Sequence, residues 1–224
     1  AMKGRQAPML SVRDQKVVIP TPIGMVHAVD GVSFDLEAGQ SMGIVGESGS
    51  GKTVTAKTLM NLLPSYALVD GSVNFDGQDL RALAAERKAD KHLWGVEISM
   101  VFQDPMTSLN PVKKVGEQLA ESRRYHLGQT RTAARRQAGD LLEQVGIPEP
   151  GRRIDEYPHQ LSGGLRQRVV IAAALACEPR ILIADEPTTS LDVTVQKHIV
   201  DLLKEGLPRT LREAFVQVLS LIHI

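Results

Sequence analysis

The sequence predicts an α/β protein whose mainly parallel sheet is interrupted by a helical insert. Short apolar segments typical of strands alternate with segments typical of helices, which is the pattern of a parallel sheet with helical connections. Between about residues 112 and 148 the pattern is helical throughout, and strand-like sequence returns at Ile181. Composition agrees with a folded domain, because 42% of the 224 residues are hydrophobic and 23% are charged.

The elements follow in order along the chain. Strands are expected at residues 17–19, 32–36, 42–45, 72–75 and 98–102. Turns are expected at Asp30-Gly31 and Ala38-Gly39, and Asp76-Gly77 predicts a hairpin turn. A helix is expected from Val54 to Leu63, just before Pro64.

Charge and cysteine content exclude several classes of protein. The 26 basic and 26 acidic residues give a net charge of zero, which argues against intrinsic disorder and against a general nucleic-acid binder. The five arginines between residues 121 and 136 are therefore interpreted as a solvated helix face. Cys177 is the single cysteine, so no internal disulfide forms and a reducing compartment is expected. The longest apolar run, residues 169–177, is far shorter than the roughly 20 residues of a membrane-spanning helix.

A glycine-rich segment matches the phosphate-binding pattern G-x-x-x-x-G-K-[ST]. It follows a predicted strand and opens a predicted helix, which is the context that this motif requires. Its glycines let successive backbone N–H groups face one anion, and the helix N-terminus adds partial positive charge. Lys52 is expected to reach the β- and γ-phosphates of a nucleotide, and the Thr53 hydroxyl to ligate Mg²⁺. The segment consists of Gly46, Glu47, Ser48, Gly49, Ser50, Gly51, Lys52 and Thr53.

A second signal lies where an apolar strand ends in two carboxylates. The strand at residues 181–184 is followed by Asp185 and Glu186. Open α/β sheets bind ligands at this end of their strands. Asp185 would hold Mg²⁺ through water, and Glu186 would orient and polarise an attacking water. Taken alone, the pair could equally cap the next turn, but the phosphate-binding segment favours the catalytic interpretation.

A third signal is the segment from Leu161 to Arg168. Ser162 is predicted to cap a helix that runs to about Cys177. Gly163 and Gly164 leave the first helical amides bare, which makes a second anion site. One nucleotide cannot obviously use both anion sites of one subunit. A head-to-tail dimer is therefore expected, in which each such segment closes over the phosphate-binding loop of the other subunit.

Together and in this order, the three motifs resemble the nucleotide-binding domain of ATP-binding-cassette (ABC) transporters. Residues 28–34, 101–111, 157–160 and 184–192 are similar to the dipeptide, oligopeptide and nickel importers, and to the D-type ATPase subunit in particular. The resemblance implies a P-loop NTPase (RecA-like) core with an antiparallel β subdomain and an α-helical subdomain insert. It implies a single domain over residues 1–224. Residues of about 9–103 and 161–224 would form its nucleotide-binding core, and about 104–160 the helical insert.

The resemblance also implies roles for single residues. Glu186 would be the general base, and Lys52 and Gln103 would complete the catalytic set. Gln103 would sense Mg²⁺ and the attacking water and couple to the membrane subunit. The implied Mg²⁺ ligands are Thr53, Gln103 and Asp185.

Nucleotide contacts are implied on both sides of the dimer. Residues 46–53 would bind the phosphates of ATP. Ser162, Gly163 and Gly164 would contact the γ-phosphate of ATP bound to the other subunit, and Asp192 would close the interface. Taken singly, Asp192 is also a plausible N-cap for a helix beginning at Val193.

The function implied is the ATP-binding and ATP-hydrolysing subunit of an importer for peptides, nickel or similar small solutes. Implied partners are membrane permease subunits, an identical or paralogous ATPase subunit and a periplasmic or extracellular solute-binding protein, with no nucleic acid. The implied location is peripheral, on the cytoplasmic face of the bacterial inner (plasma) membrane. Two alternatives stay open: an ATP-binding fragment with impaired hydrolysis, and a non-transport ABC ATPase acting on nucleic acid or the ribosome.

The sequence departs from the family pattern in two places. The position of the aromatic that stacks on adenine falls at Ile23, and apolar contact from Ile23 or Val29 is expected to recover part of the ~1–3 kcal/mol of stacking. Residues 206–224 lose the pattern, with Leu219 at the switch-histidine position and the C-terminal extension of the subfamily missing. Natural divergence would give a strand over 218–224 that carries His223 as a displaced switch. An artefactual tail on a truncated chain is favoured instead, because residues 219–224 match the translation of a transposon end.

Overall fold

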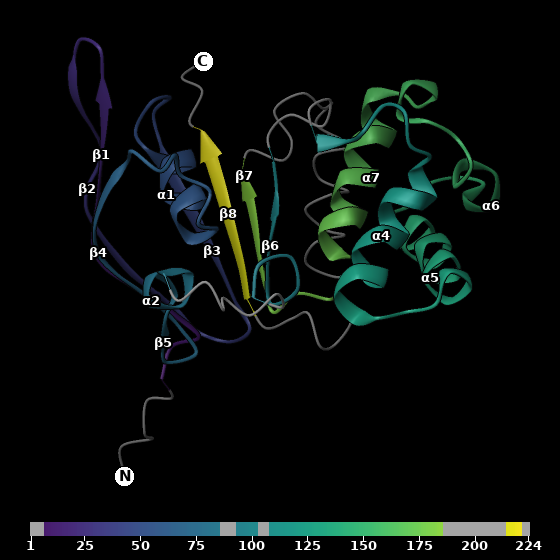
Figure 1. Ribbon diagram of the computed structural model, residues 1–224, viewed down its shortest axis with the longest axis horizontal. Helices are drawn as coiled ribbons and strands as arrows, with labels where there is room; N and C mark the ends of the chain where they lie inside the picture. Colours follow the sequence, from purple (N-terminus) through teal and green to yellow (C-terminus); the bar gives the residue numbers. More distant parts are fainter. Residues whose placement is uncertain (1–6, 86–92, 103–107, 186–213, 221–224) are drawn as a thin grey trace. The chain divides into compact units, whose positions relative to one another are not determined.

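The computed structural model describes residues 7–85, 93–102, 108–185 and 214–220 (Figure 1). The chain divides into two compact units, the first formed by residues 1–91 and 213–224 and the second by residues 92–212. The insert boundaries expected near residues 104 and 160 stay predictions. Within the described ranges, no helix has the length and apolar character needed to cross a membrane.

The first unit contains an antiparallel sheet with the strand order β2-β1-β4-β5. Its strands are β1 (Leu10–Thr21), β2 (Gly24–Leu36), β4 (Leu68–Phe75) and β5 (Gln78–Asp79), and the helix α2 (Leu80–Ala85) follows. Asp76 and Gly77 have φ values of 52° and 80°, so the predicted hairpin turn between β4 and β5 is confirmed. The first two strands are much longer than the sequence indicated.

The turn predicted at Asp30-Gly31 is wrong. These residues lie inside β2, opposite the stretch of β1 between Gln15 and Val17 where the strand register shifts. Gly31 has a φ of 74°. The pair therefore forms a β-bulge, which needs a left-handed glycine as much as a tight turn does.

The first unit also contains two parallel strands. β3 (Gln40–Gly46) pairs along its whole length with β8 (Ala214–Ser220). The strand expected at residues 42–45 is confirmed, as is the turn at Ala38-Gly39 that precedes β3. The final strand lies at 214–220 instead of 218–224, and His223 is outside the described residues.

Helix α1 (Lys52–Leu59) is displaced from its predicted range of 54–63. It begins earlier because Gly51, in a left-handed conformation, turns the chain directly into the first helical residue. It ends earlier because Asn61 adopts a left-handed φ of 53°, and the N–H of Leu62 donates to the Lys57 carbonyl oxygen at 2.9 Å. Asparagine tolerates this conformation at a helix C-terminus, so the helix stops well before Pro64.

The second unit pairs two short buried strands. β6 (Ile98–Val101) lies parallel to β7 (Ile181–Asp185), with Ile98 opposite Ile181. Every residue of both strands is buried, which explains their continuous apolar sequence. Helix α7 (Gly163–Leu175) packs on β6, and seven of its residues are buried.

The other helices and strands that the structure describes in the second unit are all helices (Figure 1). They are α4 (Val115–Leu127), α5 (Arg131–Gln144), α6 (Pro150–Arg153) and the 3₁₀ helix η1 (Pro158–Gln160). α4, α5 and α7 pack against one another in pairs. A Cβ at Gly116 would lie 2.3 Å from a side-chain carbon of Ile154, so glycine is required where the chain after α6 crosses α4. The helical pattern predicted for residues 112–148 is confirmed, with a break at Gly128 where φ is 63°.

Candidate functional site

The predicted phosphate-binding segment forms a tight loop between β3 and α1. Gly49 and Gly51 have φ values of 82° and 87°, and the Ser50 N–H donates to the Glu47 carbonyl oxygen at 3.2 Å. A Cβ at Gly51 would lie 2.1 Å from the carbonyl oxygen of Ala28 in β2. Only glycine therefore fits at the last turn of the loop, both by conformation and by space.

Lys52 lies inside this loop rather than in solvent, with 7% of its surface exposed. Its Nζ donates to the carbonyl oxygens of Gly46 at 2.9 Å and Glu47 at 2.6 Å, and to Ser50 Oγ at 3.4 Å. All three acceptors are neutral oxygens, so no carboxylate among the described residues pairs with this side chain. The loop thus places a lysine at the N-terminus of α1, where the positive end of the helix also favours an anion such as phosphate.

The first turn of α1 adds to this anion site. It carries no acidic side chain, so nothing in that turn offsets the positive end of the helix dipole. Thr55 Oγ1 donates to the Gly51 carbonyl oxygen at 3.1 Å, which fixes the start of the helix against the loop. Thr53, the expected Mg²⁺ ligand, is half-buried in the same turn.

The second predicted anion site opens helix α7. Ser162 is the N-cap, as predicted, and its Oγ accepts a hydrogen bond from the Leu165 N–H at 3.4 Å. Ser162 and Gly163 are exposed, and a Cβ at Gly163 would meet no atom within 4 Å. The start of the helix is therefore unobstructed at Gly163, while the Leu165 N–H is already bonded to the cap. The preceding 3₁₀ helix is closed by Gln160, whose Oε1 accepts from the Tyr157 N–H at 2.8 Å.

The other residues predicted for catalysis, Mg²⁺ binding and the dimer interface are only partly within the described structure. Asp185 is the last residue of β7 and is buried, with 2% of its surface exposed. Glu186, Gln103 and Asp192 lie outside the described residues. The structure brings residues 46–53 together in the first unit, and places Gly163, Gly164 and Asp185 in the second. Over the part of the chain that is described, no three His, Cys, Asp or Glu side chains cluster to hold a metal ion.

The expected base contacts occupy two different environments. Ile23 lies at the tip of the β1–β2 hairpin and is 97% exposed. Val29 is buried, and its Cγ2 lies 3.3 Å from the Cβ position of Gly51. Val29 therefore packs beneath the loop, where its side chain supports Gly51.

Sequence reasoning missed a second apolar pair on this hairpin. Val17 pairs with Val29, and Ile19 pairs with Val26 nearer to the tip. Residues two apart on a strand share a face, so Ile19 continues the face of β1 on which Val17 is buried. Val26 is 47% exposed and Ile19 is half-buried. The irregular register hides this pair from any count of positions along the sequence.

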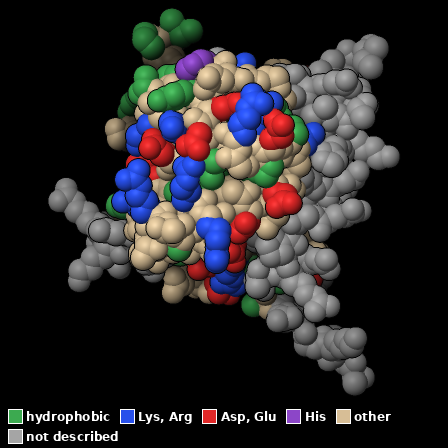
Figure 2. Space-filling view, turned by 90° about the vertical axis from the view of Figure 1, so that its right-hand side faces the viewer, with side chains coloured by type: hydrophobic (Ala, Val, Ile, Leu, Met, Phe, Trp, Pro, Cys, Tyr) green, Lys and Arg blue, Asp and Glu red, His purple; other side chains and the backbone are tan. Residues whose placement is uncertain are grey.

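Another feature absent from the sequence analysis is a groove between α4 and α5. It is a cavity of about 450 Å³. Its residues are Lys113, Gly116, Glu117, Ala120, Glu121, Arg124, Arg131 and Arg135. Gly116 and Ala120 are small and buried, whereas the other six are charged. Figure 2 shows basic and acidic side chains interspersed on the face that these helices contribute.

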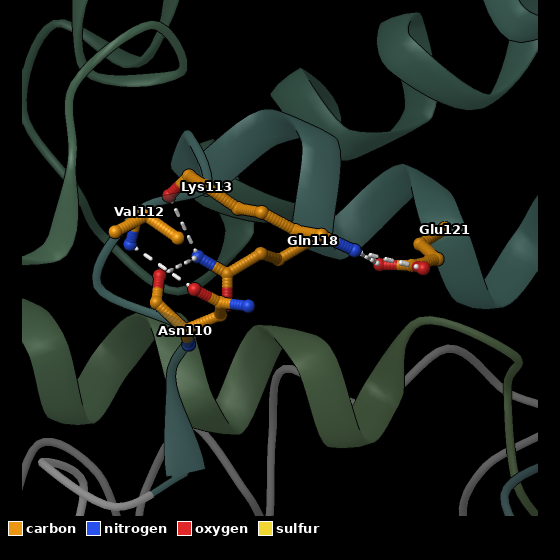
Figure 3. Close-up of polar contacts among 5 residues, drawn as sticks. All are labelled: Asn110, Val112, Lys113, Gln118 and Glu121. Carbon is orange, nitrogen blue, oxygen red and sulfur yellow. Dashed lines mark hydrogen bonds and ion pairs between the residues drawn. The ribbon is translucent and has the colours of Figure 1, made fainter.

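The segment that enters α4 is held rigidly beside this groove (Figure 3). The Gln118 Nε2 donates to the carbonyl oxygens of Asn110 and Lys113, both at 3.0 Å, and its Oε1 accepts from the Asn110 N–H at 2.8 Å. The Lys113 ammonium pairs with Glu121 at 2.8 Å. Val112, between these anchors, is 80% exposed. The chain thus presents an apolar side chain on a braced loop next to a charged groove.

Fold and site together define a P-loop nucleotide-binding fold of the ATP-binding-cassette class. The family model described as ABC transporter matches residues 29–189. The chain belongs to this family.

Its relatives include bacterial transport proteins. It is 52% identical over 199 residues to the dipeptide transport ATP-binding protein DppD of Bacillus subtilis, covering 88% of this chain and 59% of that protein. It is 49% identical over 210 residues to the oligopeptide transport ATP-binding protein OppD of Salmonella typhimurium, covering 94% and 62%. The chain thus spans about three-fifths of the length of these relatives.

Solved structures support the same fold. The ATP-binding cassette MJ0796, in a dimeric post-hydrolysis state bound to ADP and Pi, superposes with a TM-score of 0.77 at 26% identity. The superposition covers 94% of this chain and 87% of that one. A second dimeric structure of MJ0796 gives a TM-score of 0.80 at 27% identity, covering 94% of this chain and 88% of that one. The predicted fold class, a P-loop core with antiparallel β and helical parts, is confirmed.

Proposed function

We propose that this chain is the ATP-binding and ATP-hydrolysing part of an importer for peptides, or for nickel or similar small solutes. The observation that carries the proposal is the Lys52 ammonium, held by neutral oxygens at the centre of a glycine loop. An uncompensated cation at a helix N-terminus favours a polyphosphate. The relatives named for dipeptide and oligopeptide transport support the solute class.

In the proposed reaction, the loop holds the phosphates of ATP while water attacks the γ-phosphate in line. Phosphoryl transfer needs little covalent chemistry from the protein, so positioning and charge neutralisation supply most of the catalysis. Lys52 stabilises the charge on the β- and γ-phosphates, and Glu186 accepts the proton of the attacking water. Gln103 orients that water and couples the site to the membrane subunit.

Mg²⁺ fits the donor chemistry of the chain. It prefers oxygen ligands, and it usually takes one or two from the protein and the rest from phosphates and water. The Thr53 hydroxyl, the Asp185 carboxylate and the Gln103 amide oxygen would hold it. When bound, the ion neutralises charge on the transferring phosphate.

The active unit of the proposal is a head-to-tail dimer with an identical or paralogous subunit. The N-terminus of α7 is exposed and open, so a second subunit can approach it. Ser162, Gly163 and Gly164 would then contact the γ-phosphate of ATP in the other subunit, and Asp192 would close the interface. The dimeric state of the MJ0796 cassette supports this arrangement.

The helical unit would face the membrane permease. The loop that carries Val112 gives that surface an apolar contact, and the adjacent groove adds Arg131, which forms no ion pair with any described residue. A solute-binding protein outside the membrane would complete the system, and this chain would lie peripherally on the cytoplasmic face of the inner membrane.

The proposed function is tested on the full-length protein assembled with its permease and ATPase partner. Glu186→Gln keeps the shape of the side chain and removes the base. We expect this variant to bind ATP as the wild type does and to lose at least about a hundredfold in turnover, within the range of general-base effects. Normal turnover by Glu186→Gln would remove Glu186 from its assigned role.

A further inference from the structure

The helix that opens with Ser162 is tied to α5 by one of its own arginines. Arg168 Nη1 donates to the carbonyl oxygens of Gly146 at 2.8 Å and Val145 at 3.1 Å. Both carbonyls lie at the C-terminus of α5, where Val145 is the C-cap. The end of a helix carries partial negative charge and unpaired carbonyls, so a guanidinium both caps and neutralises it.

The C-terminal end of α7 is tied to α4 in the same way. Arg123 donates through Nη1 to the carbonyl oxygen of Ala176, the C-cap of α7. Its Nε donates to Gln129 Oε1 at 3.2 Å, and its Nη2 pairs with Glu178 at 3.4 Å. The Arg123 side chain is 7% exposed, so these bonds are shielded from water. Arg123 of α4 therefore caps the C-terminus of α7, and Arg168 of α7 caps the C-terminus of α5.

These two capping interactions fix both the position and the direction of α7. Arg168 lies six residues after Ser162, about 9 Å along the helix axis, and Arg123 holds the far end. A helix held at two separated points cannot pivot independently of α4 and α5. Any displacement of these helices must then move Ser162 and the two glycines with it.

We propose that Arg123 and Arg168 are positioning residues that transmit the placement of α4 and α5 to the Ser162–Gly164 anion site. Neither arginine reaches the open first turn of α7. Each acts on the site through the helix that it caps. The inference rests on the proposed function, in which that site closes on the nucleotide of the other subunit. Arg123 and Arg168 of this chain therefore affect hydrolysis of the ATP that the other subunit's loop holds. Hydrolysis of the ATP at this chain's own loop is unaffected.

The test separates the two composite sites of the assembly. In the first arrangement, this chain carries Lys52→Ala, so only the site closed by its Ser162–Gly164 segment can turn over. In the second arrangement, the equivalent loop lysine of the partner subunit is replaced, so only the site at this chain's own loop can turn over. Identical subunits are distinguished by different affinity tags.

Arg168→Met is introduced into both arrangements of the full-length assembly. We expect kcat to fall about tenfold in the first arrangement, because a charge-assisted hydrogen bond is lost. In the second arrangement kcat should stay within about twofold of the wild-type value. Arg168→Lys keeps a charged donor and should restore at least half of the lost rate. Arg136→Met is the matched control, because Arg136 is exposed on α5 and has no bonding partner in the described structure.

Arg123→Met, measured in the same two arrangements, is a second test of the positioning role. Removing a buried guanidinium leaves the Ala176 carbonyl unsatisfied, so this variant should also be less stable. Its informative quantity is the ratio of kcat losses in the two arrangements. Equal losses in both arrangements, or no loss with Arg168→Met, would overturn the positioning role. A wild-type assembly without turnover would instead overturn the proposed function, and this inference with it.

Discussion

The ammonium of Lys52 donates a hydrogen bond of 2.6 Å to the carbonyl oxygen of Glu47, five residues earlier in the same loop. Glu47 thus accepts this bond through its backbone oxygen, and its carboxylate forms no ion pair with Lys52. A lysine that is 7% exposed would normally take a carboxylate partner. Here the missing negative charge is what a bound polyphosphate would provide.

The close approach of Gly51 to β2 gives a first prediction. In Gly51→Ala the new Cβ would lie 2.1 Å from the Ala28 carbonyl oxygen, at a φ of 87°. We expect a lower unfolding temperature and at least about tenfold weaker ATP binding, because the loop must move to relieve the clash. Gly49→Ala is the control, because its φ of 82° is similar and its Cβ would meet nothing within 4 Å. Unfolding scans of both variants check this, and equal effects would contradict the steric argument.

A second prediction concerns the base of the nucleotide. Ile19 and Val26 form an apolar pair on the hairpin, next to the Val17–Val29 pair that packs against Gly51. Val26→Tyr would offer an aromatic ring there, and stacking of a base on an aromatic contributes about 1–3 kcal/mol. We expect ATP to bind about tenfold more tightly by titration calorimetry, with a smaller gain for CTP. His27→Tyr places the same ring one residue away and should change neither affinity. A larger gain from His27→Tyr would place the base on the opposite face.

The charged groove gives a third prediction. Arg131 lines the groove, is exposed and forms no ion pair with any described residue. Arg131→Glu should lower the ATPase rate of the permease-bound assembly severalfold, because reversing this charge opposes docking of a permease surface that is complementary to the arginine. Nucleotide binding by the isolated full-length subunit should stay unchanged. Arg136→Glu makes the same charge change outside the groove lining. If both variants lower the assembled rate alike, the groove is not the permease surface.

A fourth prediction follows from the carboxylate that joins α4 and α5. Asp155 accepts from Arg135 at 2.7 Å and from Lys114 at 3.3 Å. The hydrogen bond from Arg135, followed by that from Lys114, holds the pKa of Asp155 below its usual value. A lowered pKa in the folded state means that the stabilisation is present above the unfolded value of about 3.9, and is lost as pH falls through the folded value.

Unfolding temperatures across pH check that sign. The unfolding temperature of the wild type should exceed that of Asp155→Asn at pH 7, and the difference in unfolding temperature should shrink as the pH falls below about 4. Asp140→Asn, an exposed change on α5, serves as the control. A difference between wild type and Asp155→Asn that grows with acidity would contradict the assigned pairing.

Local chemistry made parts of this structure predictable. The loop from Gly46 to Thr53 and the cap at Ser162 depend on residues adjacent in sequence, so their geometry can be predicted from the motif. The bulge at Asp30-Gly31 could not be separated from a turn, because both use a glycine at positive φ. Likewise, the early end of α1 depends on Asn61 taking a left-handed conformation, which competes with the stronger stop signal of Pro64.

Long-range packing set the features that the sequence did not predict. Arg123 meets the Ala176 carbonyl 53 residues away, and Arg168 meets Val145 from 23 residues away. The groove likewise depends on how α4 and α5 pack, because Arg124 and Arg131 alone predict only a solvated face. Glu186, Gln103 and Asp192 keep their roles as predictions, since they lie outside the described residues.

The most direct measurement is titration of the protein with ATP and Mg²⁺ by calorimetry, comparing wild type, Lys52→Ala and Lys57→Ala. Lys57 lies on the same helix and serves as the charge-matched control. The account predicts saturable binding by the wild type and by Lys57→Ala, and at least about a hundredfold weaker binding by Lys52→Ala, equivalent to about 2.7 kcal/mol. Equal affinities for all three proteins would contradict the claim that this loop is the nucleotide site.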